Sequence, residues 1–355
     1  MDKVVVGMSG GVDSAVAAYL LKNEGYEVIG VTLRVWQADD GSEGRCCDID
    51  DARRAAQSIG IRYIPVNCTS DFNRFVVDPF VKEYIGGRTP NPCVLCNRYV
   101  KWDKLLYYAK AFGAKYVATG HYASVIRLEN GRYTVKKALY SEKDQTYMLY
   151  RLTQEQLAVT LTPLGGLSKS EVRDIASRAG IPVASKPDSQ EVCFVADGSY
   201  GDFIAGKTEN LRDGFFVDEE GNVLGRHRGI FNYTVGQRKG LGLPLGYPAY
   251  VKEIRRDKNE VVVSKNDSLY SSQLICDDAN FLSICGLNPG EKLRCDAKIR
   301  YGHKGRPAVI ENAGEGAVKV VFDEPVRAAA PGQSAVFYDS GGCVIGGGII
   351  REVLK

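Results

Sequence analysis

The feature that most constrains this chain is a glycine-rich segment near its start, Gly7-Met8-Ser9-Gly10-Gly11-Val12-Asp13-Ser14. It lies between an apolar run at 3–6 and a helix-forming stretch at 15–24 that ends at Gly25. This order predicts a strand that turns directly into a helix, with backbone N–H groups converging at the helix N-terminus, where they suit a nucleotide phosphate. The Gly-Lys-Ser/Thr ending of a Walker loop is missing. Asp13 is instead placed to help hold a Mg²⁺ ion that bridges phosphates.

The first 120 residues alternate short apolar runs with amphipathic segments. Strands are predicted near 28–35, 63–67 and 116–119, and helices near 49–59, 72–84 and 97–112. This alternation is typical of a parallel sheet covered by helices, in which ligands gather at the carboxyl ends of the strands. We therefore expect the glycine-rich loop, Leu33 and the turn Thr119-Gly120-His121-Tyr122 to surround one nucleotide.

Beyond residue 206 the pattern changes to short strands separated by glycine turns. The chain has 355 residues, which is long for a single core and favours several domains. Short, regularly spaced strands predict small β domains. The expected fold is therefore α/β, with a parallel-sheet domain at 1–205, a small β domain at 206–275 and a β-barrel at 276–355.

Charge and hydropathy restrict the partners. The net charge of +3 is evenly spread, so bulk electrostatics does not single out a nucleic acid. Local basic clusters could still contact phosphates. No apolar stretch reaches the roughly 18 residues of a membrane span, and the N-terminus enters a strand without the regions of a signal peptide. We expect no membrane association and a cytoplasmic location. The basic clusters are Arg98 with Lys101, Arg226 with Arg228, Arg238 with Lys239, and Lys298, Arg300, Lys304 and Arg306.

Ten cysteines without a secretion signal indicate reduced thiols, metal ligands or catalytic groups. Cys93 and Cys96 form a Cys-x-x-Cys pair after two prolines and before a predicted helix, a spacing that suits a thiol-disulfide couple, half of a zinc site or two iron-sulfur ligands. Cys193 lies in a polar, proline-containing loop. Cys46 and Cys47 are adjacent in a glycine-rich stretch, and a redox or metal role for them stays open. Five further cysteines are interpreted as buried packing residues: Cys68, Cys276, Cys285, Cys295 and Cys343.

The string from Ser9 to Ser14 resembles the PP-loop of the ATP pyrophosphatases, enzymes that split ATP into AMP and pyrophosphate while adenylating a carbonyl oxygen. Further strings in a fixed order make the whole chain similar to the bacterial tRNA-specific 2-thiouridylase (MnmA) family. The resemblance implies a PP-loop ATP-binding catalytic domain at 1–205 and a tRNA-contacting barrel at 276–355. The strings are 91–96, 119–122, 143–147 and 189–193, followed in the β region by 233–242, 298–301 and 331–333.

The resemblance implies ATP and Mg²⁺ as cofactors and tRNA as partner. The wobble uridine of tRNAs for Lys, Glu and Gln would be flipped into the site, because its 2-oxo carbon cannot be attacked while stacked. Family positions carry over residue by residue. Gly7 to Ser14, Leu33 and Gly120 would bind ATP; Asn91, Pro92 and Cys93 would line the target base; and Lys143, Asp144, Gln145, His121, Arg300, Tyr301 and Gln333 would contact tRNA.

The sulfur chemistry implied by the family centres on two cysteines. Cys193 would receive sulfur as a persulfide from a donor such as a cysteine desulfurase or a sulfur relay protein. Cys96 would act as the nucleophile that releases it, leaving a Cys96–Cys193 disulfide. Many relatives have Asp where this chain has Cys93. Cys93, Cys96 and Cys193 could therefore instead ligate a 4Fe-4S cluster whose fourth iron binds sulfide, and both routes stay open.

Two other functions are compatible with the loop. One is an ATP-dependent ligase of the argininosuccinate synthase type, which needs no cysteines. The other is a non-enzymatic RNA-binding or sulfur-carrier protein. The cysteines and the complete loop disfavour both.

Overall fold

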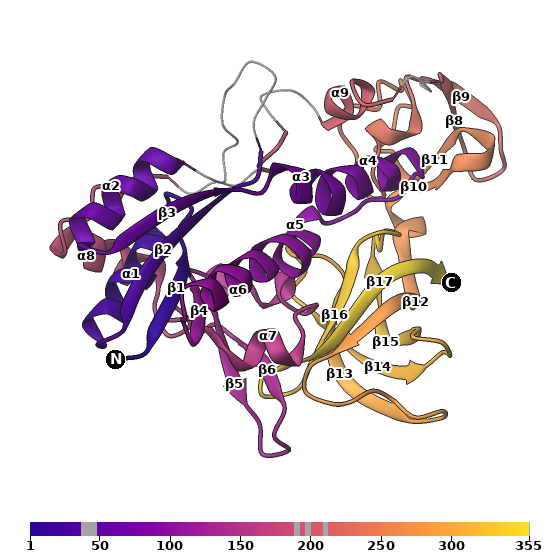
Figure 1. Cartoon of the computed structure of the whole chain (residues 1–355). Helices are drawn as coiled ribbons and strands as arrows, with labels where there is room; N and C mark the ends of the chain where they lie inside the picture. The colour runs from indigo at the N-terminus through magenta and orange to yellow at the C-terminus, as the bar shows by residue number, and fades with distance from the viewer. Residues whose placement is uncertain (37–47, 188–191, 196–199, 209–211, 355) are drawn as a thin grey trace.

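The computed structural model describes residues 1–36, 48–187, 192–195, 200–208 and 212–354. A helix-covered sheet, a small β unit and a barrel follow one another along the chain (Figure 1). The predicted α/β fold, with an N-terminal parallel sheet and a C-terminal barrel, is confirmed.

The N-terminal sheet is parallel and has the order β3-β2-β1-β4-β7. Its central strand β1 is apolar on both faces, since Val4, Val5 and Val6 are fully buried, as expected where helices cover a parallel sheet on both sides. Val4 and Val6 pack with α1, α2 and α8, whereas Val5 packs with α6. The strands are β1 (Lys3–Gly7), β2 (Glu27–Arg34), β3 (Arg62–Asn67), β4 (Tyr116–Thr119) and β7 (Thr160–Leu161); the helices are α1 (Val12–Asn23), α2 (Ile49–Ile59), α6 (Trp102–Ala111) and α8 (Lys169–Arg178).

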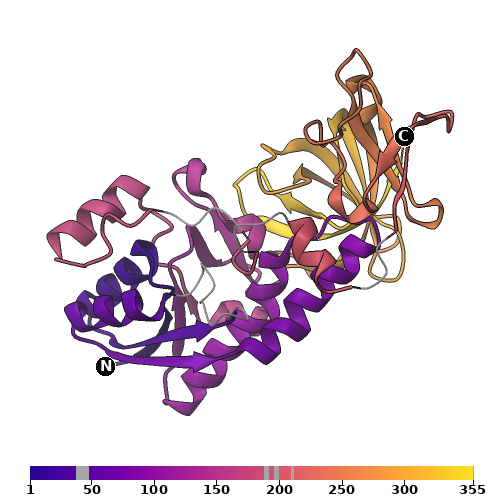
Figure 2. The same ribbon diagram turned by 90° about the horizontal axis from the view of Figure 1, so that it is seen from above.

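Two long helical segments lie between the sheet and the barrel (Figure 2). Both contain a π-helical turn, a feature often found at functional sites. The second segment begins at Pro92, earlier than predicted, because the Asn91 side chain accepts the Cys93 N–H and proline suits the first helical position. Cys93 and Cys96 therefore lie inside the helix. The segments are α3 (Thr69–Phe72), η1 (Asn73–Val77) and α4 (Asp78–Ile85), then α5 (Pro92–Cys96), η2 (Asn97–Lys101) and α6.

A hairpin and several short turns, unassigned from sequence, connect the sheet to the barrel. Thr134 Oγ1 in the hairpin donates to the Val344 carbonyl at 2.6 Å, and Tyr147 Oη donates to the Ser334 carbonyl at 2.8 Å. These contacts fix the barrel against the α/β region. The elements are β5 (Ala123–Arg127), β6 (Tyr133–Lys137), η3 (Ser141–Lys143), η4 (Thr146–Met148) and α7 (Gln154–Ala158).

The β part begins after α9 (Tyr200–Ala205). Its middle unit is a four-stranded sheet with the order β10-β11-β8-β9, and the C-terminal unit is a closed barrel with the order β12-β15-β14-β13-β16-β17. The predicted boundary at residue 276 falls inside β12. The elements are β8 (Gly214–Val217), β9 (Val223–His227), η5 (Ile230–Asn232), β10 (Tyr250–Arg255), η6 (Arg256–Lys258), β11 (Glu260–Ser264), η7 (Asn266–Leu269), β12 (Tyr270–Phe281), β13 (Lys292–Lys298), β14 (Arg306–Asn312), β15 (Val318–Arg327), β16 (Ser334–Tyr338) and β17 (Val344–Leu354).

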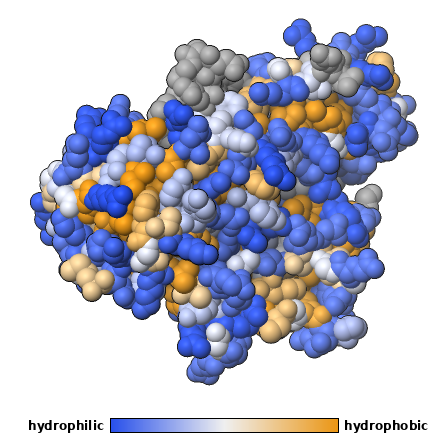
Figure 3. Space-filling model, in the orientation of Figure 1, coloured by the Kyte–Doolittle hydropathy of each residue, from blue (hydrophilic) through white to orange (hydrophobic). Residues whose placement is uncertain are grey.

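One hydrophobic core runs from the sheet into the barrel. Tyr147, Tyr150 and Leu152 pack in the same cluster as Val336 and Tyr338 of β16. Hydrophilic residues cover most of the face seen in Figure 3, with hydrophobic patches between them. Among the described residues, none of the helices is long and apolar enough to cross a membrane.

Candidate active site

The glycine-rich loop is held at the carboxyl edge of the sheet by hydrogen bonds along its length. The Met8 N–H donates to the Val31 carbonyl at 2.9 Å, and Thr32 Oγ1 donates to the Met8 carbonyl at 2.6 Å. Ser14 Oγ accepts the Ser9 N–H at 3.1 Å and donates to the Gly11 carbonyl at 3.1 Å. Helix α1 starts at Val12, earlier than predicted, after Gly11, which has no side chain with which to cap it. Its first N–H groups thus suit an anion.

Two glycines let other parts of the chain approach this loop closely. Gly10 has a φ of +78°, and a Cβ there would lie 2.5 Å from the Asp48 carbonyl oxygen. A Cβ on Gly120, at the end of β4, would lie 2.6 Å from the Ser14 nitrogen. Leu33 is buried on the neighbouring strand β2. The residues expected to bind ATP therefore gather at one edge of the sheet.

Asp13 has two partners that sequence reasoning did not assign. Tyr122 Oη donates to Asp13 Oδ1 at 2.7 Å, and Lys169 Nζ donates to the two carboxylate oxygens at 2.7 and 2.9 Å. Lys169 is the first residue of α8, where the helix dipole disfavours a cation unless an anion lies close. A lysine directly after the helix-capping Ser168 could therefore have indicated, from the sequence alone, that an anionic group lies close to it.

Asp13 suits Mg²⁺ only as one ligand among others. In the part of the chain that the structure describes, no group of three or more His, Cys, Asp or Glu side chains could hold a metal ion. Asp13 would supply one carboxylate oxygen, and nucleotide phosphates and water would complete the octahedron that Mg²⁺ prefers. The ion would neutralise phosphate charge there.

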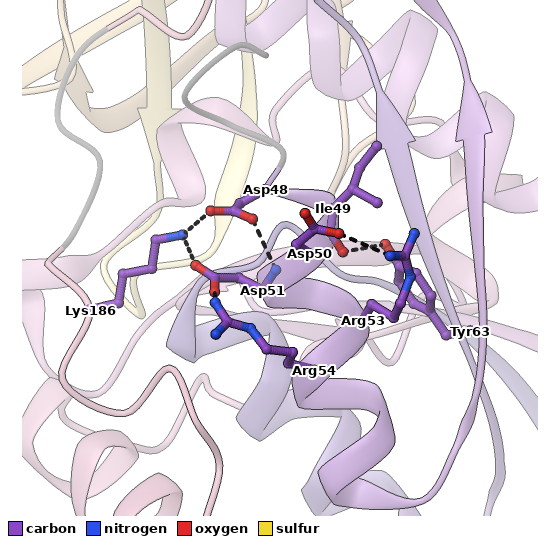
Figure 4. Close-up of polar contacts among 8 residues, drawn as sticks. All are labelled: Asp48, Ile49, Asp50, Asp51, Arg53, Arg54, Tyr63 and Lys186. Carbon is purple, nitrogen blue, oxygen red and sulfur yellow. Dashed lines mark hydrogen bonds and ion pairs between the residues drawn. The ribbon is translucent and has the colours of Figure 1, made fainter. Parts of the chain in front are cut away.

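A cluster of charged side chains ties the loop to the segment that precedes Cys193 (Figure 4). The Asp48 N–H donates to the Ser9 carbonyl at 3.1 Å, and Asp48 also caps α2. Lys186 Nζ bonds Asp48 Oδ2 at 2.9 Å and pairs with Asp51. Arg173 of α8 donates to the Lys186 carbonyl at 3.0 Å. Residues shortly before Cys193 are thereby attached beside the nucleotide loop.

Cys96 and Cys193 pack against the same core. Cys93 is exposed on α5, whereas Cys96 and Cys193 are partly buried. Both border the cluster that contains Phe194, whose ring lies 5.5 Å from that of Phe72 and 5.1 Å from that of Phe80.

The three candidate cluster ligands, Cys93, Cys96 and Cys193, all lie in the described chain. Among the described residues, they do not form a group that could hold a single metal ion; a 4Fe-4S cluster is held by thiols on different irons, so the cluster route stays a prediction beside the persulfide route. Cys46 and Cys47 lie outside the described residues.

Of the five remaining described cysteines, four are buried and one is exposed. Burial raises the pKa of Cys68 to about 11, and that of Cys276 and Cys295 to about 12. Burial also raises the pKa of Cys343. The expectation that Cys285 is buried is wrong, because its thiol is exposed and its sulfur accepts a hydrogen bond from Arg132 at 3.4 Å. Cys285 follows the barrel's first strand and faces outward.

A second group of predicted residues gathers around Tyr301. This side chain is 41% exposed. Burial, Asp144 and Cys93 raise the pKa of its phenol, while Lys143 lowers it. Lys298 Nζ lies 5.9 Å from the ring centre. Charged groups of α5, of the 141–145 turn and of the barrel therefore all act on the Tyr301 phenol, and its ring centre also lies 6.2 Å from that of Tyr147.

Asp144 and the side-chain oxygen of Gln145, both in residues expected to contact tRNA, accept hydrogen bonds within the protein. Asp144 is 7% exposed and accepts hydrogen bonds from the Ala138 and Thr146 N–H groups and the Thr146 hydroxyl. Gln145 Oε1 accepts the Tyr122 N–H at 3.0 Å. In this structure Asp144 and the side-chain oxygen of Gln145 shape the turn that follows Lys143.

His121 is a neutral residue in this site. Burial and the nearby Lys101 lower its pKa well below the usual value. Its Nδ1 lies 2.8 Å from Thr119 Oγ1, and its ring is 5.5 Å from that of Trp102. His121 can therefore stack or hydrogen-bond, but it supplies no cation for a phosphate near neutral pH.

The barrel contributes a connection and a basic surface. Gln333 Nε2 donates to the Thr89 carbonyl at 2.9 Å, which fixes the segment before Asn91. Arg300 donates to the Arg327 carbonyl at 3.1 Å. Burial and the cations Arg300, Arg306 and Lys298 lower the pKa of His303 to about 4. This part of the barrel therefore has a positive potential that suits phosphate groups.

Comparison with known proteins adds to this geometry. Three family models match the chain: a tRNA methyl transferase HUP domain at 2–197, a tRNA methyl transferase PRC-barrel domain at 201–265 and an aminomethyltransferase beta-barrel domain at 271–350. The tRNA-specific 2-thiouridylase MnmA of Lachnoclostridium phytofermentans is 52% identical over 358 residues, which cover 99% of both chains. That of Clostridioides difficile is 50% identical over 359 residues, again 99% of both. The chain belongs to the MnmA family.

The resemblance inferred from the ordered motifs is thus confirmed. The similarity to the MnmA proteins covers nearly the whole chain and not the nucleotide loop alone. A solved structure, the U34-tRNA thiolase NcsA from Methanococcus maripaludis with its [4Fe-4S] cluster, is 20% identical with a TM-score of 0.36, covering 59% of this chain and 65% of that one.

Proposed function

We propose that this protein is a sulfurtransferase that converts the wobble uridine of tRNA into 2-thiouridine at the expense of ATP. Its substrates would be tRNAs for Lys, Glu and Gln, and it would act in the cytoplasm. The observation that carries the proposal is the joint placement of a preformed anion-binding loop and two core-anchored cysteines in a chain of the MnmA family.

The first step is adenylation. ATP lies with its phosphates at the N-terminus of α1, where N–H groups stabilise negative charge as it develops. The 2-oxo oxygen of uridine attacks the α-phosphorus, and the bond from that phosphorus to the bridging oxygen breaks and releases pyrophosphate. Gly120 and Leu33 border this position. The uridine oxygen then belongs to a good leaving group, AMP.

The second step transfers sulfur. A persulfide-bearing donor protein leaves one sulfur on Cys193. The terminal sulfur attacks C2 of the uridine, and AMP departs with the oxygen and its bonding electrons. The Cys96 thiolate then attacks Cys193 Sγ, so the new sulfur stays on the base and the two cysteines form a disulfide. An external dithiol reduces this disulfide for the next cycle.

The tRNA would bind across the domains. Asn91, Pro92 and Cys93 would line the pocket for a flipped base, and Tyr301 offers an aromatic face beside Cys93. Lys143 and the cations around His303 would contact phosphates.

A single-turnover assay tests the proposal. Wild-type protein, ATP, Mg²⁺, a persulfide donor and unmodified tRNA should yield 2-thiouridine by nucleoside mass spectrometry under anaerobic conditions. Cys96→Ser and Cys193→Ser should abolish the product, and Cys285→Ser, the exposed control, should retain it. Cys93→Asp should be tolerated. The persulfide route is excluded if iron-free protein is inactive and activity returns with iron and sulfide. ATP consumption without any sulfur gained by tRNA overturns the function itself.

A further inference from the structure

A chain of hydrogen bonds runs from the nucleotide loop to the barrel. Asp13 Oδ1 accepts from Tyr122 Oη at 2.7 Å. The backbone of Tyr122 is bonded twice to Gln145: its N–H donates to Gln145 Oε1 at 3.0 Å, and its carbonyl accepts the Gln145 N–H at 3.0 Å. The adjacent Asp144 accepts from Thr146 Oγ1 at 2.8 Å. That hydroxyl lies 3.1 Å from Tyr338 Oη in β16.

Most of this path is shielded from water. Tyr122 is 2% exposed, Asp144 is 7% exposed, and Thr146 and Tyr338 are fully buried. A buried polar group that loses its partner pays a desolvation cost, and bonds in a low-dielectric network strengthen one another. Moving a residue at one end of the path would therefore strain the hydrogen bonds along its whole length.

The two ends of the path lie at the two sites of the proposed reaction. Asp13 is in the nucleotide loop. The other end carries Lys143, next to Asp144, and lies close to Tyr301, whose ring centre is 6.2 Å from that of Tyr147, the residue after Thr146. A phosphate or base held at Lys143 and Tyr301 would fix the 141–145 turn, whose Gln145 holds Tyr122.

We infer that Tyr122 is a positioning residue that links occupancy of the tRNA site to the orientation of Asp13 in the nucleotide site. The inference rests on the proposed function. With tRNA bound, the fixed turn holds the Tyr122 hydroxyl on Oδ1 of Asp13, which restricts the carboxylate to one orientation. The tRNA therefore tightens nucleotide binding, and by linkage the nucleotide tightens tRNA binding by the same factor, in the range of about 5 to 150 for such couplings.

The test is a titration of the full-length protein with a non-hydrolysable ATP analogue and Mg²⁺, with and without saturating unmodified tRNA. The ratio of the two dissociation constants measures the coupling. Tyr122→Phe and Tyr338→Phe break the path near its two ends and should bring the ratio towards one. Each ratio takes the same variant's affinity without tRNA as its reference, so a change in that affinity alone does not alter the ratio.

Tyr150→Phe is the matched control. Its hydroxyl is also fully buried at the same domain interface, where it accepts from Ser334 Oγ at 3.1 Å, but it lies off the path. This variant should keep the wild-type ratio. A Tyr122→Phe protein that unfolds cooperatively and retains the full ratio overturns the inference, as does a wild-type ratio of one. Failure of the wild type to form 2-thiouridine would instead overturn the proposed function.

Discussion

Gly120→Ala should disable the nucleotide loop through a single added methyl group. The new Cβ would lie 2.6 Å from the Ser14 nitrogen, 2.7 Å from the Asp13 carbonyl carbon and 2.9 Å from the Asp13 carbonyl oxygen. All three contacts are backbone atoms of the first turn of α1, so no flexible side chain can move away. To remove these steric clashes, β4 and α1 must move apart by about 0.5 to 1 Å, which should lower the free energy of unfolding by about 1 to 3 kcal/mol.

The displaced atoms are those that would hold the phosphates, so adenylation should suffer more than stability. A shift of about 1 Å at a reacting centre can lower the rate by about 100-fold. Urea unfolding measures the first effect, and AMP release in single-turnover reactions measures the second. Gly166→Ala is the control, because a Cβ there meets nothing within 4 Å. A Gly120→Ala protein that equals this control in both assays would refute the close approach.

Two further predictions concern charged groups. Lys186 is one-third exposed and bonds Asp48 and Asp51, so the contact contributes up to about 1 kcal/mol. Lys186→Met should therefore slow sulfur transfer by up to about fivefold while the rate of adenylation changes little, and Lys186→Arg should restore the transfer rate. An equal loss in both steps would contradict a role specific to Cys193. The pKa of His303 is lowered to about 4, so the unfolded state binds the proton first and the free energy of unfolding should fall as pH drops from about 6.5 to about 4. His303→Gln should flatten that slope in urea titrations at pH 5 and pH 7, and an unchanged slope would count against this assignment.

Local patterns in the sequence were sufficient for the sheet and the loop. The apolar run at Val4 to Val6 and the glycines at 7, 10 and 11 determine a strand, a tight turn and a helix start within a few residues of one another. Helix periodicity also located the long helical segments, although it does not record the π-turns or the Asn91 side-chain cap that starts the second segment at Pro92.

The partners of the site residues could not be predicted in the same way. Lys169 lies 156 residues from Asp13, and Tyr122 lies 109 residues away. Such pairings follow from the order of the strands in the sheet and not from spacing along the chain. Asp144 is likewise buried beside Thr146, whose hydroxyl lies 3.1 Å from Tyr338 Oη of the barrel, and such a contact between distant parts of the chain cannot be read from the local sequence.

The central claim is that the uridine oxygen is activated by adenylation, and an isotope measurement tests it most directly. A tRNA whose wobble uridine carries ¹⁸O at the 2-oxo position would be thiolated in one turnover, and the AMP would be analysed by mass spectrometry. The account predicts one ¹⁸O atom in the phosphate of AMP for each 2-thiouridine formed. Unlabelled AMP alongside thiolated tRNA would contradict it.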